Sequence, residues 1–379
     1  MDNPRITSIE WGVLQGQRPR TAGRNARLPE HGPTMRDPIA RITLEDGSRG
    51  FGFSRANQQQ AEALLGTLLN DLISVEHGVS AAGKLIDFAL WDALGQRTGK
   101  PVYALAAEYY GTPVPEALRA PCYDTSLYFD DLDLDSDEEA GALIAQEAME
   151  GWACGHRAFK MKVGRGALHM PLEAGTTRDI AVIHAVRQAI GPDIPLMIDA
   201  NNGWNVNLAK QVLSETADCD LCWLEEPFHE DEVLDNHLQN WMRERRISVL
   251  LADGEGLASP RLMAWAQAGA IDVVQYDLRD VGLTHWLKTG KQLDDWGVRS
   301  APHNYGSNFG NYATCHLAGV IANFTFVEWD AADTPALDAA GYQLIEGFVH
   351  VPDAPGFGLK LDEALFQQAV EEGGFHVQQ

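Results

Sequence analysis

One unit repeats through the later two thirds of this chain: a short apolar run followed by a stretch long enough for a helix. Eight such runs follow residue 118: APCYDTS, RAFKMKV, IPLMIDA, LCWLEE, SVLLADG, IDVVQYD, VRSAPH and FTFVEW. Continuous apolar runs are typical of parallel strands buried on both faces, and the intervening segments supply crossover helices. Eight strands in this arrangement predict a closed α/β barrel of the TIM-like kind.

The segments before and after the barrel have a different pattern. ITSIEWGVLQ and PIARITLEDGSRGFGFS alternate like strands, with Asp46-Gly47 as a hairpin turn, and two helical stretches follow. The tail contains a Gly- and Pro-rich stretch, APGFGLKLD. We predict an α+β domain in residues 1–118, the barrel in residues 119–334, and a C-terminal segment, residues 335–379, that packs back on the first domain.

Composition narrows the range of partners and locations. Hydrophobic residues make up 45% of the chain without any apolar run of membrane-spanning length, which predicts a soluble protein. The N-terminus lacks a basic region followed by an apolar stretch, so no secretion signal is expected. A net charge of −25 disfavours nucleic acid or an anionic membrane as a partner.

Cysteine usage indicates a reducing compartment. The 5 cysteines are scattered and odd in number, which favours the cytoplasm over an oxidising environment. Cys219 and Cys222 form a C-x-x-C motif. Because no second pair accompanies it, we do not expect this motif to be a zinc or redox site.

Three apolar runs lead directly into carboxylates: Asp199 after PLMI, Glu225 after CWL, and Glu255 after VLLADG. The C-terminal ends of parallel barrel strands meet at one rim, where these carboxylates would repel one another unless a cation lay between them. Oxygen-only ligands favour a hard divalent ion, and we predict Mg²⁺. Glu226 and Asp253 are the competing ligands. We prefer Glu225 because neighbours on a strand face opposite ways, and Glu255 because it is nearer the rim.

Lys160 and Lys162 lie two residues apart in the strand-like run AFKMKV, so their side chains share one face. An exposed polar strand is the simpler interpretation. The apolar neighbours instead favour two inward-facing lysines that require nearby carboxylates. A lysine beside a second cation and a metal has its ammonium form disfavoured and can serve as a neutral base.

Asp277 and His303 end two successive apolar runs, and Glu328 ends the next. An isolated histidine is usually structural. A carboxylate bonded to one imidazole nitrogen, however, fixes the tautomer and raises the basicity of the other, so we predict a catalytic Asp–His dyad. Glu328 completes the rim. One residue per strand end, from Lys162 to Glu328, recurs at intervals of 22 to 37 residues, which fits one βα unit each.

Together these motifs resemble the enolase superfamily in its mandelate racemase-like subgroup. The matching elements are K-M-K, IDAN, WLEEP, DGE, the Asp277/His303 pair, Glu328 and the helical stretch IDFALWDALGQRTGKPVYALA from Ile86. The resemblance implies an N-terminal capping domain that closes over a (β/α)₇β barrel. It also implies Mg²⁺-assisted removal of the proton α to a carboxylate, and a symmetric homo-oligomer.

Two outcomes follow from such an intermediate: reprotonation, as in a racemase or epimerase, or loss of a β-hydroxyl to give a 2-keto-3-deoxy acid. We favour dehydration of a sugar acid because the cap and rim carry many polar residues. A racemase, epimerase or cycloisomerase is the main alternative, and a non-catalytic sugar-acid binding protein is another. We predict Lys162 as base and His303 as general acid. The predicted substrate contacts are Arg24, Tyr123, Lys160, Asn201 and Asn304.

Overall fold

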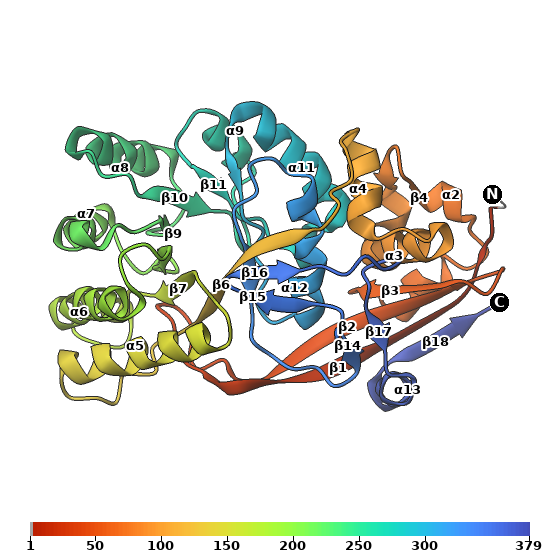
Figure 1. Cartoon of the computed structure of the whole chain (residues 1–379), viewed down its shortest axis with the longest axis horizontal. Coiled ribbons are helices and arrows are strands. Elements are labelled where there is room, and N and C mark those ends of the chain that lie inside the picture. Colours follow the sequence, from red (N-terminus) through yellow and green to blue (C-terminus); the bar gives the residue numbers. More distant parts are fainter. Residues whose placement is uncertain (1–2) are drawn as a thin grey trace.

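The computed structural model describes residues 3–379, and its centre is a parallel barrel (Figure 1). The barrel strands are β6 (Arg119–Leu127), β7 (Phe159–Lys162), β8 (Leu196–Asp199), β9 (Trp223–Glu225), β10 (Leu250–Asp253), β11 (Val273–Val274), β12 (Arg299–Ser300) and β13 (Val327–Trp329). Each pairs with the next in chain order from β6 to β12, and β13 pairs with β6. A parallel bridge between Ser300 and Phe324, which lies just before β13, joins the remaining gap. The predicted barrel is confirmed.

Helices connect successive strands on the outside of the barrel (Figure 1). They are α5 (Asp137–Ala153), α6 (Leu172–Ile190), α7 (Val206–Glu215), α8 (Glu232–Arg245), α9 (Leu262–Gln267), α10 (Leu278–Val281), α11 (Leu283–Trp296) and α12 (Asn308–Cys315). Polar caps fix where several begin: Ser136, Asn205, Asp231 and Ser307 each accept a backbone N–H from the first turn. Because a helix returns the chain after each strand, the barrel strands run parallel and their C-terminal ends lie at the same rim.

The first sheet has the order β18-β1-β2-β3. Its strands are β1 (Ile6–Ala22), β2 (Gly32–Leu44), β3 (Arg49–Phe53) and β18 (Phe375–Gln378). The Asp46-Gly47 turn lies between β2 and β3, as predicted, with Gly47 at a φ of +82° that favours glycine. The shorter elements that follow are α1 (Gln58–Glu62), α2 (Leu69–Leu72), β4 (Ile73–Ser74), β5 (Gly78–Val79), α3 (Asp87–Thr98) and α4 (Val102–Tyr110).

The C-terminal segment returns to both parts of the molecule. Helix α13 (Glu363–Gly373) lies along β1, and β18 pairs with β1 in antiparallel register. Strand β16 (Phe348–His350) pairs with β6 in antiparallel register, and β15 (Gln343–Ile345) pairs with β16. Strand β14 (Leu337–Asp338) pairs with β17 (Lys360–Leu361). The proposed domain boundaries stay a prediction. Within residues 3–379, no helix is both long and apolar enough to cross a bilayer.

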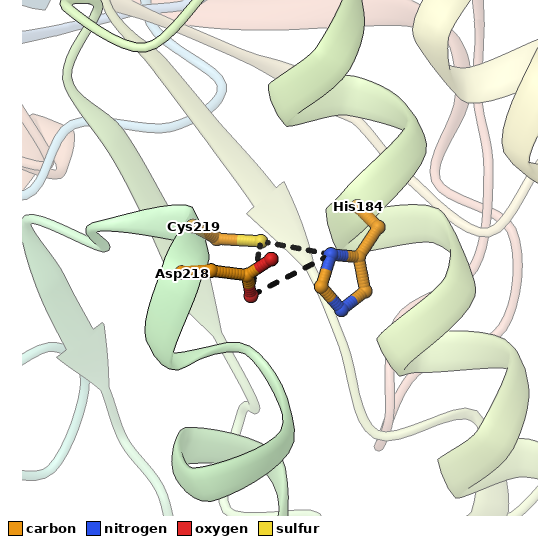
Figure 2. Close-up of side chains that lie close together, drawn as sticks. All are labelled: His184, Asp218 and Cys219. Atoms are coloured by element: carbon orange, nitrogen blue, oxygen red, sulfur yellow. Dashed lines mark hydrogen bonds and ion pairs between the residues drawn. The ribbon is translucent and has the colours of Figure 1, made fainter.

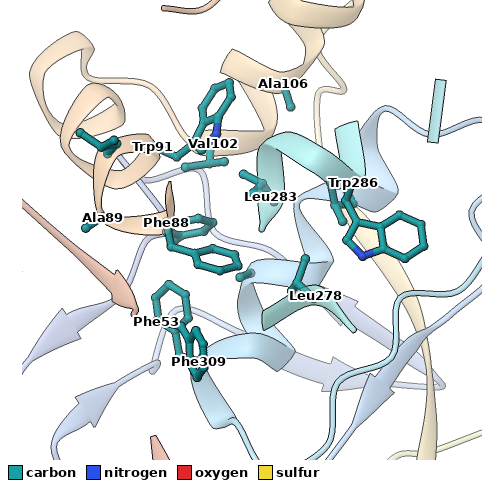
Figure 3. Close-up of a cluster of buried hydrophobic side chains, with 14 of the residues drawn as sticks. Phe53, Phe88, Ala89, Trp91, Val102, Ala106, Leu278, Leu283, Trp286 and Phe309 are labelled. Atoms are coloured by element: carbon teal, nitrogen blue, oxygen red, sulfur yellow. The ribbon is translucent and has the colours of Figure 1, made fainter. Parts of the chain in front are cut away.

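One apolar core joins the first domain to the barrel (Figure 3). Phe88 of α3 packs against Phe53 of β3 and against Phe309 of α12, so rings from β3, α3 and the barrel interlock. Two buried carboxylates also cross this interface. Asp87 accepts the backbone N–H of Leu283 at 2.8 Å, and Asp37 accepts that of Phe309 at 2.8 Å. Each carboxylate thus satisfies orphan donors at the start of a barrel helix.

Candidate active site

The structure brings the three preferred carboxylates together at the rim. Asp199 ends β8, Glu225 ends β9, and Glu255 lies just beyond β10. One oxygen from each falls within 4.8 Å of the others. The competing acids make other contacts: Glu226 Oε2 lies 3.3 Å from the Asn201 amide nitrogen and 3.4 Å from Arg27 Nη2, and Asp253 accepts the Gly254 N–H. Glu226 lies just beyond β9 at a φ of +40°, and burial together with the nearby Glu255 and Asp199 raises its pKa to about 9, so the choice of Glu225 as the ligand stays a prediction.

The electrostatics of this triad call for a cation. Burial raises the pKa of Glu225, Lys160 lowers it, and the nearby Asp199 and Glu255 raise it further, so that it reaches about 8. Ionising all three carboxylates at this distance costs free energy because like charges repel, and a bound cation offsets that repulsion. The donors are all oxygens, which fits the preference of Mg²⁺. The residues present therefore fit the predicted ion.

Lys160 and Lys162 both project from β7 into this cluster. The Lys160 Nζ lies 2.6 Å from Glu225 Oε1 and 3.0 Å from Glu328 Oε1, and the Lys162 Nζ binds Asp199 Oδ2. Burial lowers the pKa of both lysines, but the carboxylates outweigh burial and raise it. The carboxylates alone thus keep Lys162 protonated, and the predicted neutral base requires a cation that offsets them.

The predicted Asp–His pair forms on the other side of the triad. A parallel backbone bridge sets Asp277 beside His303, and the His303 Nδ1 lies 3.0 Å from Asp277 Oδ2. The Nε2 points inward, 3.0 Å from Glu255 Oε2 and 3.6 Å from Glu328 Oε2. Burial lowers the pKa of His303, yet Glu255, Glu328 and Asp277 together raise it to about 10. The imidazolium form is therefore favoured.

Arg279 supports this pair and was not expected from the sequence. Its Nη2 lies 2.9 Å from Asp277 Oδ2, and its backbone N–H donates to Asp277 Oδ1 at 2.8 Å. Burial raises the pKa of Asp277, but His303 and Arg279 outweigh it and hold that pKa far below its usual range. The signal in the sequence was the short spacing Asp277-Leu278-Arg279 at the start of a helix, which lets the arginine fold back on the cap residue.

Two predicted substrate residues lie close to the triad. Asn201, in the left-handed region at a φ of +42°, donates its backbone N–H to Asp199 Oδ1 at 2.8 Å. Its amide nitrogen also lies 3.4 Å from Glu255 Oε1, so it orients the carboxylates. Tyr123 lies beneath the lysines: the Lys160 Nζ is 5.3 Å from its ring centroid, and its side chain is buried against Trp223.

The other two predicted substrate residues do not reach the triad. The Asn304 amide nitrogen donates to Ser307 O and Asn311 Oδ1, and its Oδ1 packs where a Cβ on Gly310 would lie. Only its backbone N–H contacts the rim, donating to Glu328 Oε2 at 2.9 Å. Arg24 instead lines an outer hollow beside Phe129, Asp130 and Asp133.

Arg27, from the same loop as Arg24, contacts the acids at the rim. Its Nη2 lies 3.4 Å from Glu226 Oε2 and 3.7 Å from Glu255 Oε1, while the side chain remains 42% exposed. The loop between β1 and β2 carries both arginines, and its irregular backbone turns the later one toward the barrel. Arg27 thus links the first domain to two of the rim carboxylates.

An aromatic group borders the site beside Lys162. The Lys162 Nζ is 5.5 Å from the Tyr128 ring centroid, and Tyr128 packs against Tyr305 at 5.6 Å. His31, from the same loop as Arg27, packs against both rings at 5.1 and 5.5 Å. The His31 Nδ1 donates to Gly23 O, so its outward-facing nitrogen is the Nε2. Sequence reasoning did not single out either tyrosine, because each follows a strand end without a charge to mark it.

Comparisons with known proteins agree with this geometry. The Enolase C-terminal domain-like family matches residues 143–365. A galacturonate dehydratase from Geobacillus sp., whose crystal structure contains D-galacturonate and 5-keto-4-deoxy-D-galacturonate, is 45% identical, with a TM-score of 0.94 and 99% of each chain covered. The D-galactarolactone cycloisomerase of Agrobacterium fabrum is 30% identical over 73% of this chain and 70% of its own. The L-talarate/galactarate dehydratase of Salmonella typhimurium is 27% identical over 86% of this chain and 80% of its own.

The chain belongs to the enolase superfamily, with an Enolase C-terminal domain-like barrel. Within it, the chain is an enzyme of the hydro-lyase class, as predicted. The predicted Mg²⁺ cofactor is likewise confirmed, by the acidic triad here and by the magnesium complexes of the Geobacillus relative.

Proposed function

We propose that this enzyme dehydrates a hexuronate of the D-galacturonate type. The observation that carries the proposal is the placement of Lys162 and the Asp277–His303 pair on opposite sides of one carboxylate triad. Lys162 contacts Asp199 and His303 contacts Glu255, with Glu225 between them on the intervening strand. A substrate carboxylate held at this triad would expose its α-carbon to a base on each face.

Lys162 is the proposed base. It takes the proton from the carbon next to the substrate carboxylate, and the C–H electron pair moves into that carboxylate to give an enediolate. The C–O bond at the β-carbon then breaks, and the His303 Nε2–H gives its proton to the departing hydroxyl, so that water leaves. The resulting enol becomes a ketone. For galacturonate this chemistry removes the proton at C5 and the hydroxyl at C4.

Charge control is shared among the neighbouring groups. Mg²⁺ held by Asp199, Glu225 and Glu255 would offset their attraction for the Lys162 ammonium and stabilise the charge that develops on the substrate carboxylate. Lys160, buried between Glu225 and Glu328, supplies a fixed positive charge to the same carboxylate. Glu328 positions His303 Nε2 from 3.6 Å.

The polar groups around the site favour a substrate with one carboxylate rather than two. A second carboxylate needs an uncompensated cation to balance its charge. Arg18, over the Tyr305 ring, is already bidentate to Asp330 at 3.0 and 2.7 Å. Burial lowers the pKa of His31, which keeps that imidazole neutral. The part of the site beside Arg18 and His31 therefore favours neutral hydroxyl groups of a substrate over a second carboxylate.

A panel of acids with Mg²⁺ tests the proposal. D-galacturonate, D-galactonate and galactarate should each be incubated with enzyme, with keto-acid formation as the readout. We expect turnover of galacturonate at least about tenfold above that of the diacid, since one uncompensated charge costs more than 1.4 kcal/mol. Exchange of the α-proton in D₂O without keto acid would instead indicate a racemase or epimerase. Lactone isomerisation would indicate a cycloisomerase, and binding without either would indicate a non-catalytic protein.

We further propose a symmetric homo-oligomer in the cytoplasm. Large apolar side chains are exposed at the rim, with Val233 at the start of α8 75% exposed and Leu257 beyond β10 fully exposed. Such side chains favour burial against another subunit. All 5 cysteines are free thiols, which suits a reducing compartment. A monomer by light scattering at micromolar concentration would refute the oligomer.

A further inference from the structure

Three side chains with metal-binding atoms converge on the outer surface of the barrel, away from the rim (Figure 2). His184 projects from α6, while Asp218 and Cys219 belong to the short helical turn η3 (Ala217–Cys219). This turn precedes β9, and Glu225 ends β9, so the cluster lies toward the opposite end of that strand from the active site. None of these residues contributes to the proposed dehydration.

The spacing of the three donor atoms is close to that of a metal site. The His184 Nδ1 is 3.2 Å from Cys219 Sγ and 3.9 Å from Asp218 Oδ1, and the sulfur and oxygen are 4.0 Å apart. Zinc bonds of about 2.0–2.3 Å at tetrahedral angles place such donors roughly 3.3–3.6 Å apart. Shifts of a few tenths of an ångström would therefore bring all three into coordination, and a side-chain rotation of the exposed Asp218 supplies most of that change.

The histidine is already oriented as a ligand. Its Nε2 lies 3.1 Å from Glu215 O, and a carbonyl only accepts, so the Nε2 carries the hydrogen. The Nδ1 lone pair is thereby left facing Cys219 and Asp218. Metal-bound histidines usually donate the second ring N–H to a carbonyl or carboxylate in this way. The turn is also anchored, because Arg187 Nε donates to Cys219 O at 2.7 Å.

We propose that His184, Asp218 and Cys219 bind one zinc ion, with water in the open fourth position. The mixed sulfur, nitrogen and oxygen set favours zinc over the Mg²⁺ of the rim. Binding breaks the S–H bond of Cys219, releases that proton to solvent and forms a Zn–S bond. The side chain of Cys219 is 1% exposed, whereas those of His184 and Asp218 are 40% and 77% exposed, so the ion enters from solvent on their side. The ion would join α6 to the turn that leads into β9.

The competing interpretation is a simple hydrogen bond from the Cys219 thiol to His184 Nδ1. Burial and the Asp218 carboxylate raise the pKa of Cys219 to about 11, so the free thiol is protonated and can make that bond. A hydrogen bond of this kind satisfies a buried thiol without any affinity for metal. Direct metal titration distinguishes the two.

Cobalt(II), a spectroscopic substitute for zinc, is the probe. The full-length enzyme, with excess Mg²⁺ to fill the rim site, should take up one equivalent and develop a thiolate-to-cobalt charge-transfer band that zinc abolishes. Cys219→Ser should remove the band. His184→Gln, at a partly exposed helix position, should weaken binding by more than about tenfold. Cys222→Ser is the matched control. It should leave the charge-transfer band and the affinity for cobalt unchanged, as should Glu225→Gln.

Several results would overturn the proposal. One is a wild-type protein that shows no charge-transfer band at millimolar cobalt, and another is a band that survives in Cys219→Ser or disappears in Cys222→Ser. Thermal unfolding gives a second readout: zinc should raise the Tm of wild type and Cys222→Ser but not that of His184→Gln. If Cys219→Ser fails to fold, His184→Gln decides the question alone.

Discussion

Two sets of buried carboxylates in this enzyme differ in what surrounds them: one set lies among other charged groups at the rim, and the other accepts hydrogen bonds from the backbone. At the rim, Asp199 and Glu225 face each other and the lysines of β7, with like charges close together. At the interface with the barrel, Asp37 and Asp87 face backbone N–H groups at helix starts. A carboxylate beside other carboxylates needs a cation to offset the repulsion, whereas a carboxylate that accepts backbone N–H groups has its hydrogen-bond partners within the protein. Burial alone therefore does not mark a functional acid; its partners do.

Replacement at the rim should separate activity from stability most strongly. Glu225→Gln removes one charge from the triad, and we expect turnover to fall by about a thousandfold or more, because developing charge loses its electrostatic support. Mg²⁺ should no longer raise the Tm. The unfolding free energy in EDTA should stay within about 1 kcal/mol of wild type, since like-charge repulsion is relieved. Turnover and urea unfolding measure the two effects, and full activity would refute the assignment of Glu225.

The interface should show the reverse pattern. Asp37→Ala leaves the Phe309 N–H and the Ser307 hydroxyl without their acceptor, so we expect a loss of about 3 kcal/mol in unfolding free energy. The affinity for Mg²⁺ should not change. Asp37→Asn, which keeps an accepting oxygen, is the control and should recover part of the loss. An alanine variant as stable as wild type would contradict this role.

Asp92, a buried carboxylate that links β3 to the C-terminal segment, should make stability depend on pH. Asp92 accepts the N–H groups of Phe51 and Phe357, and burial raises its pKa to about 7. The folded state thus holds this proton more tightly than the unfolded chain, so the contribution of Asp92 to stability is fully present below its unfolded pKa of 3.8 and is lost as pH rises toward 7. Between pH 5 and 8, wild type should lose on the order of 2 kcal/mol relative to Asp92→Asn. A pH-independent difference between the two in urea unfolding would refute the shift.

The smallest expected effect concerns two arginines of one loop. Arg27 contacts Glu226 and Glu255, whereas Arg24 lies in the outer hollow. Arg27→Ala should therefore raise KM or lower kcat/KM by about tenfold, the usual effect of losing one partly exposed charged contact. Arg24→Ala should remain within about twofold. A loss in Arg24→Ala as large as that in Arg27→Ala, or no loss in Arg27→Ala, would contradict this difference between the two arginines.

The strand-end residues were predictable because one geometric rule places them. Because parallel strands end at a common rim, the spacing of the strand ends along the sequence was enough to predict that Asp199, Glu225 and Glu255 lie close together. Irregular segments follow no such rule. The loop that carries Arg24 and Arg27 has no regular spacing, so the sequence did not show that Arg27 contacts Glu255 while Arg24 lines the outer hollow; the predicted substrate contact of Arg24 stays a prediction.

Other features depended on details of packing that a sequence pattern does not contain. Asn304 follows His303 at the rim, yet its amide turns inward over Gly310, where only a glycine leaves room. The His184–Cys219 contact joins residues 35 positions apart on separate elements. The C-x-x-C motif was not expected to bind a metal, and it gave no indication that Cys219 contacts a histidine of another helix.

The central claim is that Lys162 removes the proton from the α-carbon while His303, on the opposite side of the site, protonates the hydroxyl that leaves the β-carbon. Exchange of the α-proton in D₂O, followed by NMR alongside keto-acid formation, tests it in single variants. We expect His303→Asn to retain exchange with galacturonate while losing dehydration by at least about a hundredfold, because the departing hydroxyl lacks its proton donor. Lys162→Ala should lose both. If His303→Asn abolishes exchange while Lys162→Ala retains it, the assignment of base and acid is contradicted.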